Sequence, residues 1–194
     1  MKDRASRISG IAVAGALFLA LSGVASAGEV ADKAAEAEAL LQAGKAAEAQ
    51  QALDQAIDAF WKNAPLTLNN VRFVEEAKGF GDYIPHEGNR FGPSSAIQVY
   101  VEPQGFSWTE GADGHKIALS SEIEIRNAKG QVLTKSSTPV LFEKVSRNRN
   151  REFQITLGVP LPALKTGDYV LVLKVTDAAT GRSAATELPF SVTG

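Results

Sequence analysis

Residues 116–126, with the sequence KIALSSEIEIR, carry the clearest secondary-structure signal in the chain. Apolar and polar side chains alternate along them, which is typical of a β-strand with one face in a core and one toward solvent. The inward face would carry Ile117, Leu119, Ser121, Ile123 and Ile125. The outward face would carry Lys116, Glu122, Glu124 and Arg126. This stretch therefore predicts a half-buried strand.

The same period of two residues extends over much of the chain after residue 64. It recurs in residues 97–101, 153–157, 169–175 and 184–192. Turn signals separate such runs at 127–130 and 177–181. Pro189 marks the last run as an edge strand or a bulge, because proline cannot donate to a ladder of backbone hydrogen bonds. We predict a mainly β fold for residues 64–194, an antiparallel sandwich of seven to eight short strands in two sheets.

One segment leaves the strand count open. If residues 131–145 form one bent strand that is broken near Pro139, the sandwich has seven strands. If 131–136 and 138–145 are separate up-and-down strands, it has eight, and the turn that follows lies at the other end of the sandwich. We favour the seven-stranded arrangement.

Leu164, Gly167 and Tyr169 form a Leu-x-x-Gly-x-Tyr pattern at the start of a predicted strand. This pattern resembles the tyrosine corner of immunoglobulin-like and fibronectin type III sandwiches. The resemblance implies a structural role for these residues, with the Tyr169 hydroxyl bonded to a backbone group a few residues upstream. It also implies that residues 168–176 and 182–192 are the last two strands of an immunoglobulin-like (Ig-like) β-sandwich.

Residues 28–63 follow a helical period instead and are rich in the good helix formers Ala, Glu and Gln. Gly44 divides them, so we expect an N-terminal α-helical hairpin with helices at about 30–42 and 45–62. Residues 30–62 resemble a single helical pair of the tetratricopeptide-repeat type. No second copy is present, and such repeats need stacked neighbours for stability, so the resemblance does not bring peptide binding with it.

The hairpin has too few large apolar residues to be stable alone. The residues expected to be buried are Leu40, Leu41, Leu53, Ile57, Phe60 and Trp61. Their burial does not offset the conformational entropy lost when more than thirty residues become ordered. The hairpin should therefore dock on the sandwich, dimerise with a second copy, bind another partner or stay partly disordered, and docking on the sandwich is favoured.

Residues 1–27 predict a secretory signal peptide. Lys2, Arg4 and Arg7 make a basic start, residues 11–21 are apolar or small, and the small residues Ala25 and Ala27 mark cleavage after Ala27. The apolar run is about half the ~20 residues that a membrane span needs. We expect a periplasmic or secreted product with no membrane span in the mature chain.

Composition narrows the function classes. The sequence has no cysteine, so an exported product would fold without disulfides. The signal peptide carries a net charge of +2, which changes the charge of −2 for the whole chain to −4 for the mature one. Residues 28–63 carry three basic and seven acidic side chains, which accounts for all of that −4, and residues 64–194 are neutral overall. Neither part has the basic excess typical of nucleic-acid binding.

Catalytic chemistry has little support in the sequence. No serine lies in a Gly-x-Ser-x-Gly pattern, and no phosphate-binding or dinucleotide-binding glycine motif is present. His86-Glu87 begins like a zinc-protease motif, but Arg90 stands where the second histidine is needed. We expect no enzyme activity, no cofactor and no metal. The alternative is a metal-dependent or hydrolytic enzyme that uses the loop around His86, with Asp82 and Glu87.

The candidate binding residues are aromatic and basic side chains in loops. In the seven-stranded arrangement, one rim of the sandwich carries Phe106, Trp108, Arg147, Arg149 and Arg182. Indole rings contact ligands through a large apolar surface, and guanidinium groups suit carboxylates and phosphates. The favoured function is an exported, non-catalytic binding or scaffold module of the bacterial envelope that contacts an anionic glycan or an acidic protein segment. Residues 79–103 also resemble exported bacterial proteins with an Ig-like body, a resemblance that implies no function.

Overall fold

The computed structural model describes residues 25–161 and 163–194. The first 24 residues of the predicted signal peptide therefore lie outside the described part. The two helices are α1 (Ala25–Gln42) and α2 (Ala46–Asn63). The strands are β1 (Thr67–Gly79), β2 (Asp82–Pro85), β3 (Arg90–Phe91), β4 (Ala96–Gln104), β5 (Thr109–Gly111), β6 (Gly114–Asn127), β7 (Val132–Lys135), β8 (Val140–Ser146), β9 (Ile155–Pro160), β10 (Gly167–Asp177) and β11 (Ser183–Val192). The prediction of a mainly β chain with two helices and antiparallel sheets is confirmed.

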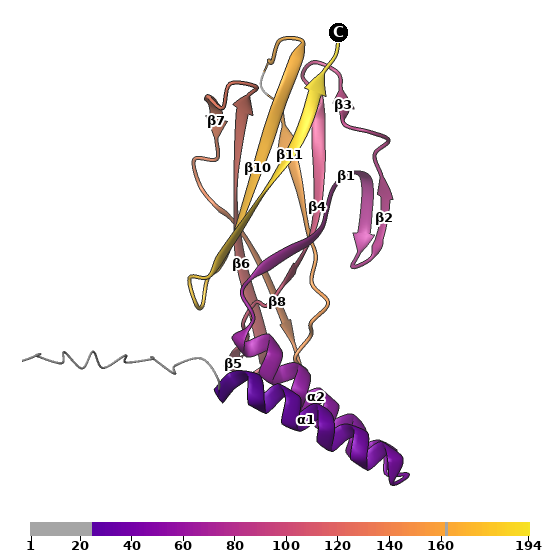
Figure 1. Ribbon diagram of the computed structural model, residues 1–194. Helices are drawn as coiled ribbons and strands as arrows, with labels where there is room; N and C mark the ends of the chain where they lie inside the picture. The colour runs from indigo at the N-terminus through magenta and orange to yellow at the C-terminus, as the bar shows by residue number, and fades with distance from the viewer. Residues whose placement is uncertain (1–24, 162) are drawn as a thin grey trace, which may run out of the picture.

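The helices run back along each other from a tight turn and project from one end of the β-strands (Figure 1). Gly44 makes this turn with a φ of 75°, a left-handed conformation that suits glycine. The facing surfaces of the two helices include the small buried residues Ala37, Ala49, Ala52 and Ala56. Neither helix of the described chain is long and apolar enough to cross a membrane.

The expected burial of the large apolar helix residues is wrong for most of them. Leu41 is 63% exposed, Leu53 43% and Phe60 59%. Small alanine side chains face the other helix and let the backbones approach closely, so the larger side chains point away from the contact. Leu40 and Ile57 are half-buried, and Trp61 alone of the six is buried.

The strands form two sheets. One has four strands in the order β2-β1-β4-β9. The other follows the order β3-β11-β10-β6-β5, with β7 and β8 also paired to β6. All pairs are antiparallel except β3 with β11. Over most of its length β11 pairs on one side only, because β3 reaches just Ser191 and Val192, which explains how Pro189 is accommodated.

Both β7 and β8 run antiparallel to β6 and pair with successive parts of it. They act as one strand interrupted at residues 136–139, as in the seven-stranded alternative. The loop that follows β8 therefore lies at the same end of the molecule as the turn between β10 and β11.

The core lies between the two sheets and continues toward the helical end. Its fully buried members include Ile97, Val99, Val101, Ile117, Leu119, Ile155, Leu171, Leu173 and Val175. These residues come from β4, β6, β9 and β10 at alternate positions. Trp61 and Phe106 extend this cluster to the base of α2.

Candidate functional site

The last turn of α2 meets the strands through Trp61. Its indole Nε1–H donates a hydrogen bond of 2.7 Å to the backbone carbonyl of Phe106 in a buried environment. The indole ring packs edge-on against the Phe106 ring at 5.2 Å and stacks on the Trp108 ring at 5.7 Å. Three aromatic rings from α2 and the β4–β5 loop thus form one cluster, which we call the aromatic joint.

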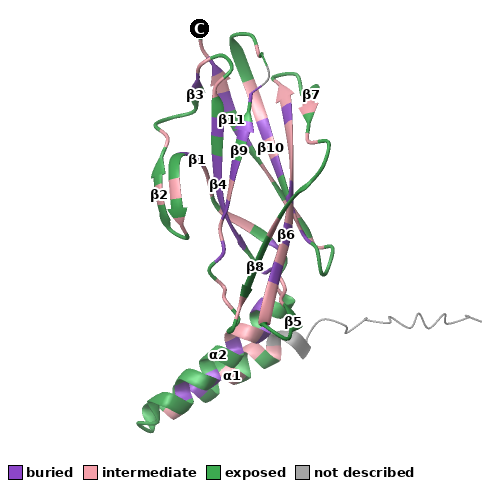
Figure 2. Cartoon of the chain, turned by 180° about the vertical axis from the view of Figure 1, so that it is seen from behind, coloured by how far each residue is buried: buried purple, intermediate pink, exposed green. Residues whose placement is uncertain are grey.

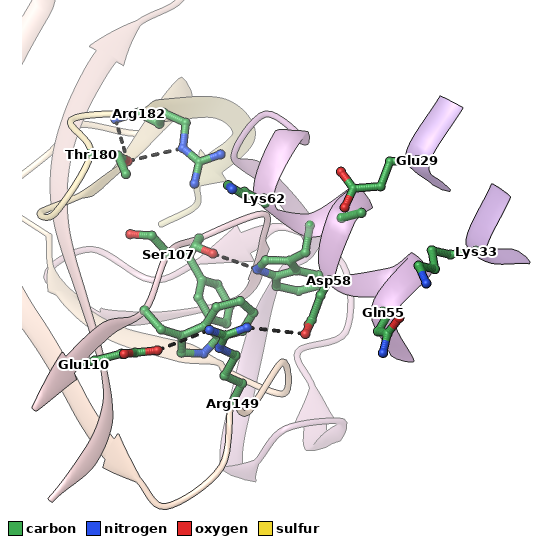
Figure 3. A pocket seen from close by; sticks show the side chains of 14 residues that line it. Glu29, Lys33, Gln55, Asp58, Lys62, Ser107, Glu110, Arg149, Thr180 and Arg182 are labelled. Carbon is green, nitrogen blue, oxygen red and sulfur yellow. Dashed lines mark hydrogen bonds and ion pairs between the residues drawn. The ribbon is translucent and has the colours of Figure 1, made fainter. Parts of the chain in front are cut away.

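Two arginines of the β8–β9 loop bind the outer side of the same helix. Arg149 donates to Asp58 of α2 at 3.4 Å and to Glu110 of β5 at 3.3 Å (Figure 3). Arg151 donates to the other carboxylate oxygen of Asp58. Partly exposed ion pairs of this kind stabilise a fold by only about 0–1 kcal/mol each. Their main effect is to orient the guanidinium of Arg149, which lies 6.0 Å from the Trp108 ring centre.

The end of α2 is held from a third direction by the β10–β11 turn. Arg182 donates to the carbonyl of Ala64 at 2.7 Å and to the Thr180 hydroxyl at 3.2 Å. Gly105 lies so close that an added Cβ would be 2.3 Å from the Pro65 carbonyl oxygen, and its φ is 77°. Only glycine fits this approach, so the β4–β5 loop can lie directly against the chain leaving α2.

A buried carboxylate organises the loops on the body side. Asp177 is 1% exposed and accepts hydrogen bonds from the backbone N–H of Ser107 at 2.8 Å and from its hydroxyl. The N–H groups of Ala179 and Thr180 also donate to it. Burial alone would raise the pKa of Asp177, but the hydrogen bonds, led by the Ser107 hydroxyl, outweigh burial and lower the pKa. The carboxylate thereby fixes the β4–β5 loop to the β10–β11 turn.

These contacts border an open cavity of about 900 Å³ at the junction of helices and strands, which we call the joint cavity. Its walls come from α1, α2, the β4–β5 loop, β5, the β8–β9 loop and the β10–β11 turn (Figure 3). It is lined by Glu29, Lys33, Gln55, Asp58, Ala59, Trp61, Lys62, Phe106, Ser107, Trp108, Glu110, Arg149, Thr180 and Arg182. The lining combines indole rings with charges of both signs.

The structure brings most of the predicted rim residues to this cavity. Trp108, Arg149 and Arg182 line it, and Phe106 contributes to its floor although its residue surface is fully buried. Phe106 is thus a core residue and not an exposed contact. Arg147 is not part of the lining, because α2 reaches the loop farther along, through Asp58.

Several cavity residues were not predicted, since they belong to the helices or to turns. The sequence pattern predicts Trp61 as a buried residue of the hairpin, and it does not single out Gln55, Asp58 or Lys62. The available signal was Trp61 itself, a large amphipathic side chain in the last helical turn beside Pro65. An indole there must find both an apolar contact and a hydrogen-bond acceptor outside its own helix.

The residues of the tyrosine-corner pattern lie at the opposite end of β10. The Tyr169 hydroxyl donates to the carbonyl of Lys165 at 2.7 Å, four residues upstream. Its ring stacks on Phe190 at 5.6 Å, and Leu164 packs against the core. Gly167 begins β10 opposite Val192 of β11.

His86 has local partners only. Its Nε2 lies 3.6 Å from a Glu75 carboxylate oxygen, and its ring packs on Phe91 at 4.5 Å. Asp82, His86 and Glu87 do not converge: in residues 25–161 and 163–194, no group of three or more His, Cys, Asp or Glu side chains is placed to hold a metal ion.

Comparison with known proteins does not define a class for this fold and site. No protein-family profile matches the chain, and no curated protein matches its sequence. Three solved structures show low similarity, and none reaches a TM-score of 0.5. The Bacillus subtilis sporulation control protein Spo0M has a TM-score of 0.35 and 11% identity, over 68% of this chain and 50% of that one.

The other two solved structures have similarly low TM-scores and identities. A Pseudomonas fluorescens alkylpurine DNA glycosylase, AlkC, bound to DNA with an abasic-site analogue, has a TM-score of 0.35 and 8% identity, over 79% of this chain and 40% of that one. A superoxide reductase from Ignicoccus hospitalis has a TM-score of 0.28 and 11% identity, over 56% of this chain and 77% of that one. The chain spans half or less of the first two proteins, and these similarities carry no functional argument.

Proposed function

We propose that the mature chain is an exported, non-catalytic binding module of the bacterial envelope, with the joint cavity as its ligand site. The observation that carries this proposal is the convergence of five separate segments on one cavity of about 900 Å³. Concave sites with an apolar surface and a few oriented polar groups are typical of ligand binding. The basic, apolar and small-residue segments of residues 1–27 support export. The hydrogen bond from Tyr169 to Lys165 supports an Ig-like sandwich.

The chemistry of the cavity favours an anionic glycan. The half-buried indole of Trp108 offers an apolar surface for a sugar ring. Arg182 and Lys62 supply positive charge, and Lys62 has no ion-pair partner among the described residues. Gln55 and Glu110 supply polar groups for sugar hydroxyls. A glycan with a carboxylate at the Arg182 side would use both kinds of surface.

Tryptophan fluorescence tests this proposal directly, because both tryptophans of the chain lie at the cavity. The mature protein is titrated with uronic-acid oligosaccharides and with neutral oligosaccharides of the same length. We expect a saturable change with the anionic series only. Lys62→Gln should weaken binding roughly fivefold, the effect of about 1 kcal/mol. Arg147→Gln, outside the cavity, is the matched control. A flat response to the whole anionic series, or equal affinity of the Lys62 variant, would refute the proposal.

A protein partner at the helical hairpin is a second candidate, favoured by the exposure of Leu53 and Phe60. These residues are seven positions apart and share one side of α2 with Ile57 between them. Residues 28–63 carry a net charge of −4, so two hairpins would repel each other. A basic amphipathic partner therefore suits this surface better than dimerisation through the hairpin does. Loss of binding on Leu53→Ser with Phe60→Ser would test it.

A further inference from the structure

The outer edge of the seven-stranded sheet is the largest concentration of exposed apolar side chains. Among the described residues, ten large hydrophobic side chains are exposed, and five of them belong to β7 and β8. These five are Val132, Leu133, Val140, Leu141 and Val145. Figure 2 shows β8 largely in green, the colour of exposed residues.

The backbone of β8 is also half unpaired. It pairs with β6 from Val140 to Ser146, and no other described strand pairs with it. Its outward N–H and C=O groups can therefore accept a further strand. Natural proteins usually cover such an edge, because an exposed apolar edge strand is a template for pairing with another chain.

We propose that the occupant of this edge is a second copy of the chain, with the two β8 strands paired antiparallel across a two-fold axis at Glu143. The two seven-stranded sheets would then continue into each other. Each copy presents the same strand, so the interface is isologous and closed. Nothing in the proposed ligand binding requires this pairing, and neither inference depends on the other.

The register follows from the pattern of β8. Opposite residues in an antiparallel pair point to the same face, so the two-fold axis must pass through a residue position. With Glu143 at the axis, Leu141 lies opposite Val145 of the second copy, twice in the dimer. With Phe142 at the axis, Leu141 would instead lie opposite Glu143. The first register pairs the two residues that are 54% exposed in the single chain.

The remaining positions suit the same register. Phe142, which packs partly against the core, lies opposite Lys144 of the second copy, an aromatic and cationic pair. Glu143 lies opposite Glu143 of the second copy, but in each chain this carboxylate forms a salt bridge with Lys116, whose Nζ lies 2.5 Å from Oε1. Residues 64–194 have no net charge, so the paired bodies add no net repulsion to that between the two hairpins, which carry −4 each. Net charge therefore opposes pairing of two hairpins but does not oppose pairing of the two bodies at β8.

Disulfide trapping tests this register, because the chain contains no cysteine. In the proposed dimer the two Glu143 Cα atoms lie about 4.5–5.5 Å apart, within the range that a disulfide bridges. Mature Glu143→Cys should therefore form a covalent dimer under mild oxidation. Leu141→Cys is the matched control, since its two copies would lie about 13 Å apart. Equal cross-linking of both variants, or none of Glu143→Cys, would overturn the proposal.

Sedimentation equilibrium of the cysteine-free mature protein gives an independent measurement. We expect a concentration-dependent dimer that Leu141→Lys with Val145→Lys weakens at least tenfold. Both side chains are exposed, so this variant should keep the circular dichroism spectrum of the wild type. Leu53→Ser with Phe60→Ser on α2 should leave the dimer unchanged. A protein that stays monomeric at every concentration, or a dimer lost only in the α2 variant, would contradict pairing at β8.

Discussion

Replacing Trp61 tests whether the helices are held to the strands by the aromatic joint. Trp61→Phe keeps most of the ring but removes the Nε1–H that bonds to the Phe106 carbonyl at 2.7 Å. That buried carbonyl loses its side-chain donor, which costs about 1–3 kcal/mol. Trp61→Ala also removes the contacts with the Phe106 and Trp108 rings, so the loss of unfolding free energy should reach about 3–5 kcal/mol.

The neighbouring residue provides the control for this experiment. Phe60 is 59% exposed, and Phe60→Ala should change the free energy of unfolding by no more than about 0.5 kcal/mol. Urea unfolding followed by circular dichroism measures all three variants. A shift of the midpoint at constant slope reports stability alone. Equal effects of Trp61→Ala and Phe60→Ala on the free energy of unfolding would contradict this reasoning. The aromatic joint would then not hold the helices to the strands, and the helical wall of the joint cavity would not be anchored by it.

Two further predictions concern buried titratable groups. The pKa of Asp177 is lowered from 3.8, so its carboxylate stabilises the fold above that pH and loses this effect as pH falls through the lower folded value. Asp177→Asn should therefore lower the free energy of unfolding by about 2–3 kcal/mol at pH 7. Urea unfolding should show this difference between variant and wild type becoming smaller below pH 3.8. Burial, with a hydrogen bond to Glu102, raises the pKa of Tyr100 to about 12. The protonated hydroxyl therefore stabilises the fold up to pH 10, and this contribution disappears as pH rises toward 12. Ultraviolet titration should show one of the three tyrosines ionising near pH 12, and Tyr100→Phe should remove that step and no other.

The strands were predictable where one face is buried and the other is solvated. Residues 116–126 show the strict alternation, and β6 covers them as Gly114–Asn127. The outer face of β4 is an exception to this alternation of buried and solvated side chains. Tyr100 is buried there beneath the β1–β2 turn, where the N–H of Gly81 donates to its hydroxyl at 2.8 Å. Glu102 is buried beside it and accepts hydrogen bonds from the Tyr100 hydroxyl and from the Asn70 side chain of β1, both at 2.6 Å. A contact between segments so far apart in the chain leaves no periodic signal.

The helices show the opposite difficulty. Their existence follows from composition, but their buried face does not follow from hydrophobicity. Small residues such as Ala52 pack between the helices, while Leu53 and Phe60 face solvent. The sequence predicts burial of these two large residues, whereas the structure buries the alanines instead. Close helix contact selects for small side chains, and sequence pattern alone does not separate such a contact from a core of large residues.

Part of the candidate site was accessible from strand parity alone. Parity places the β4–β5 loop, the β8–β9 loop and the β10–β11 turn at one end, which brought Trp108, Arg149 and Arg182 together as expected. Parity does not say where a separate helical element docks. The contacts of Trp61 and Asp58 complete the cavity, and they depend on the exact approach of α2.

The proposed dimer and the proposed ligand site have a consequence when they are combined. β8 ends at Ser146, just before the loop that carries Arg149 to the joint cavity. In the antiparallel register centred on Glu143, the two Ser146 residues are six positions apart along the paired strands, about 20 Å. The two cavities then lie beyond opposite ends of the strand pair, so one dimer holds two separate ligand sites. Binding to a polymeric glycan would be bivalent, and Leu141→Lys with Val145→Lys should weaken binding to long chains but not to short oligosaccharides.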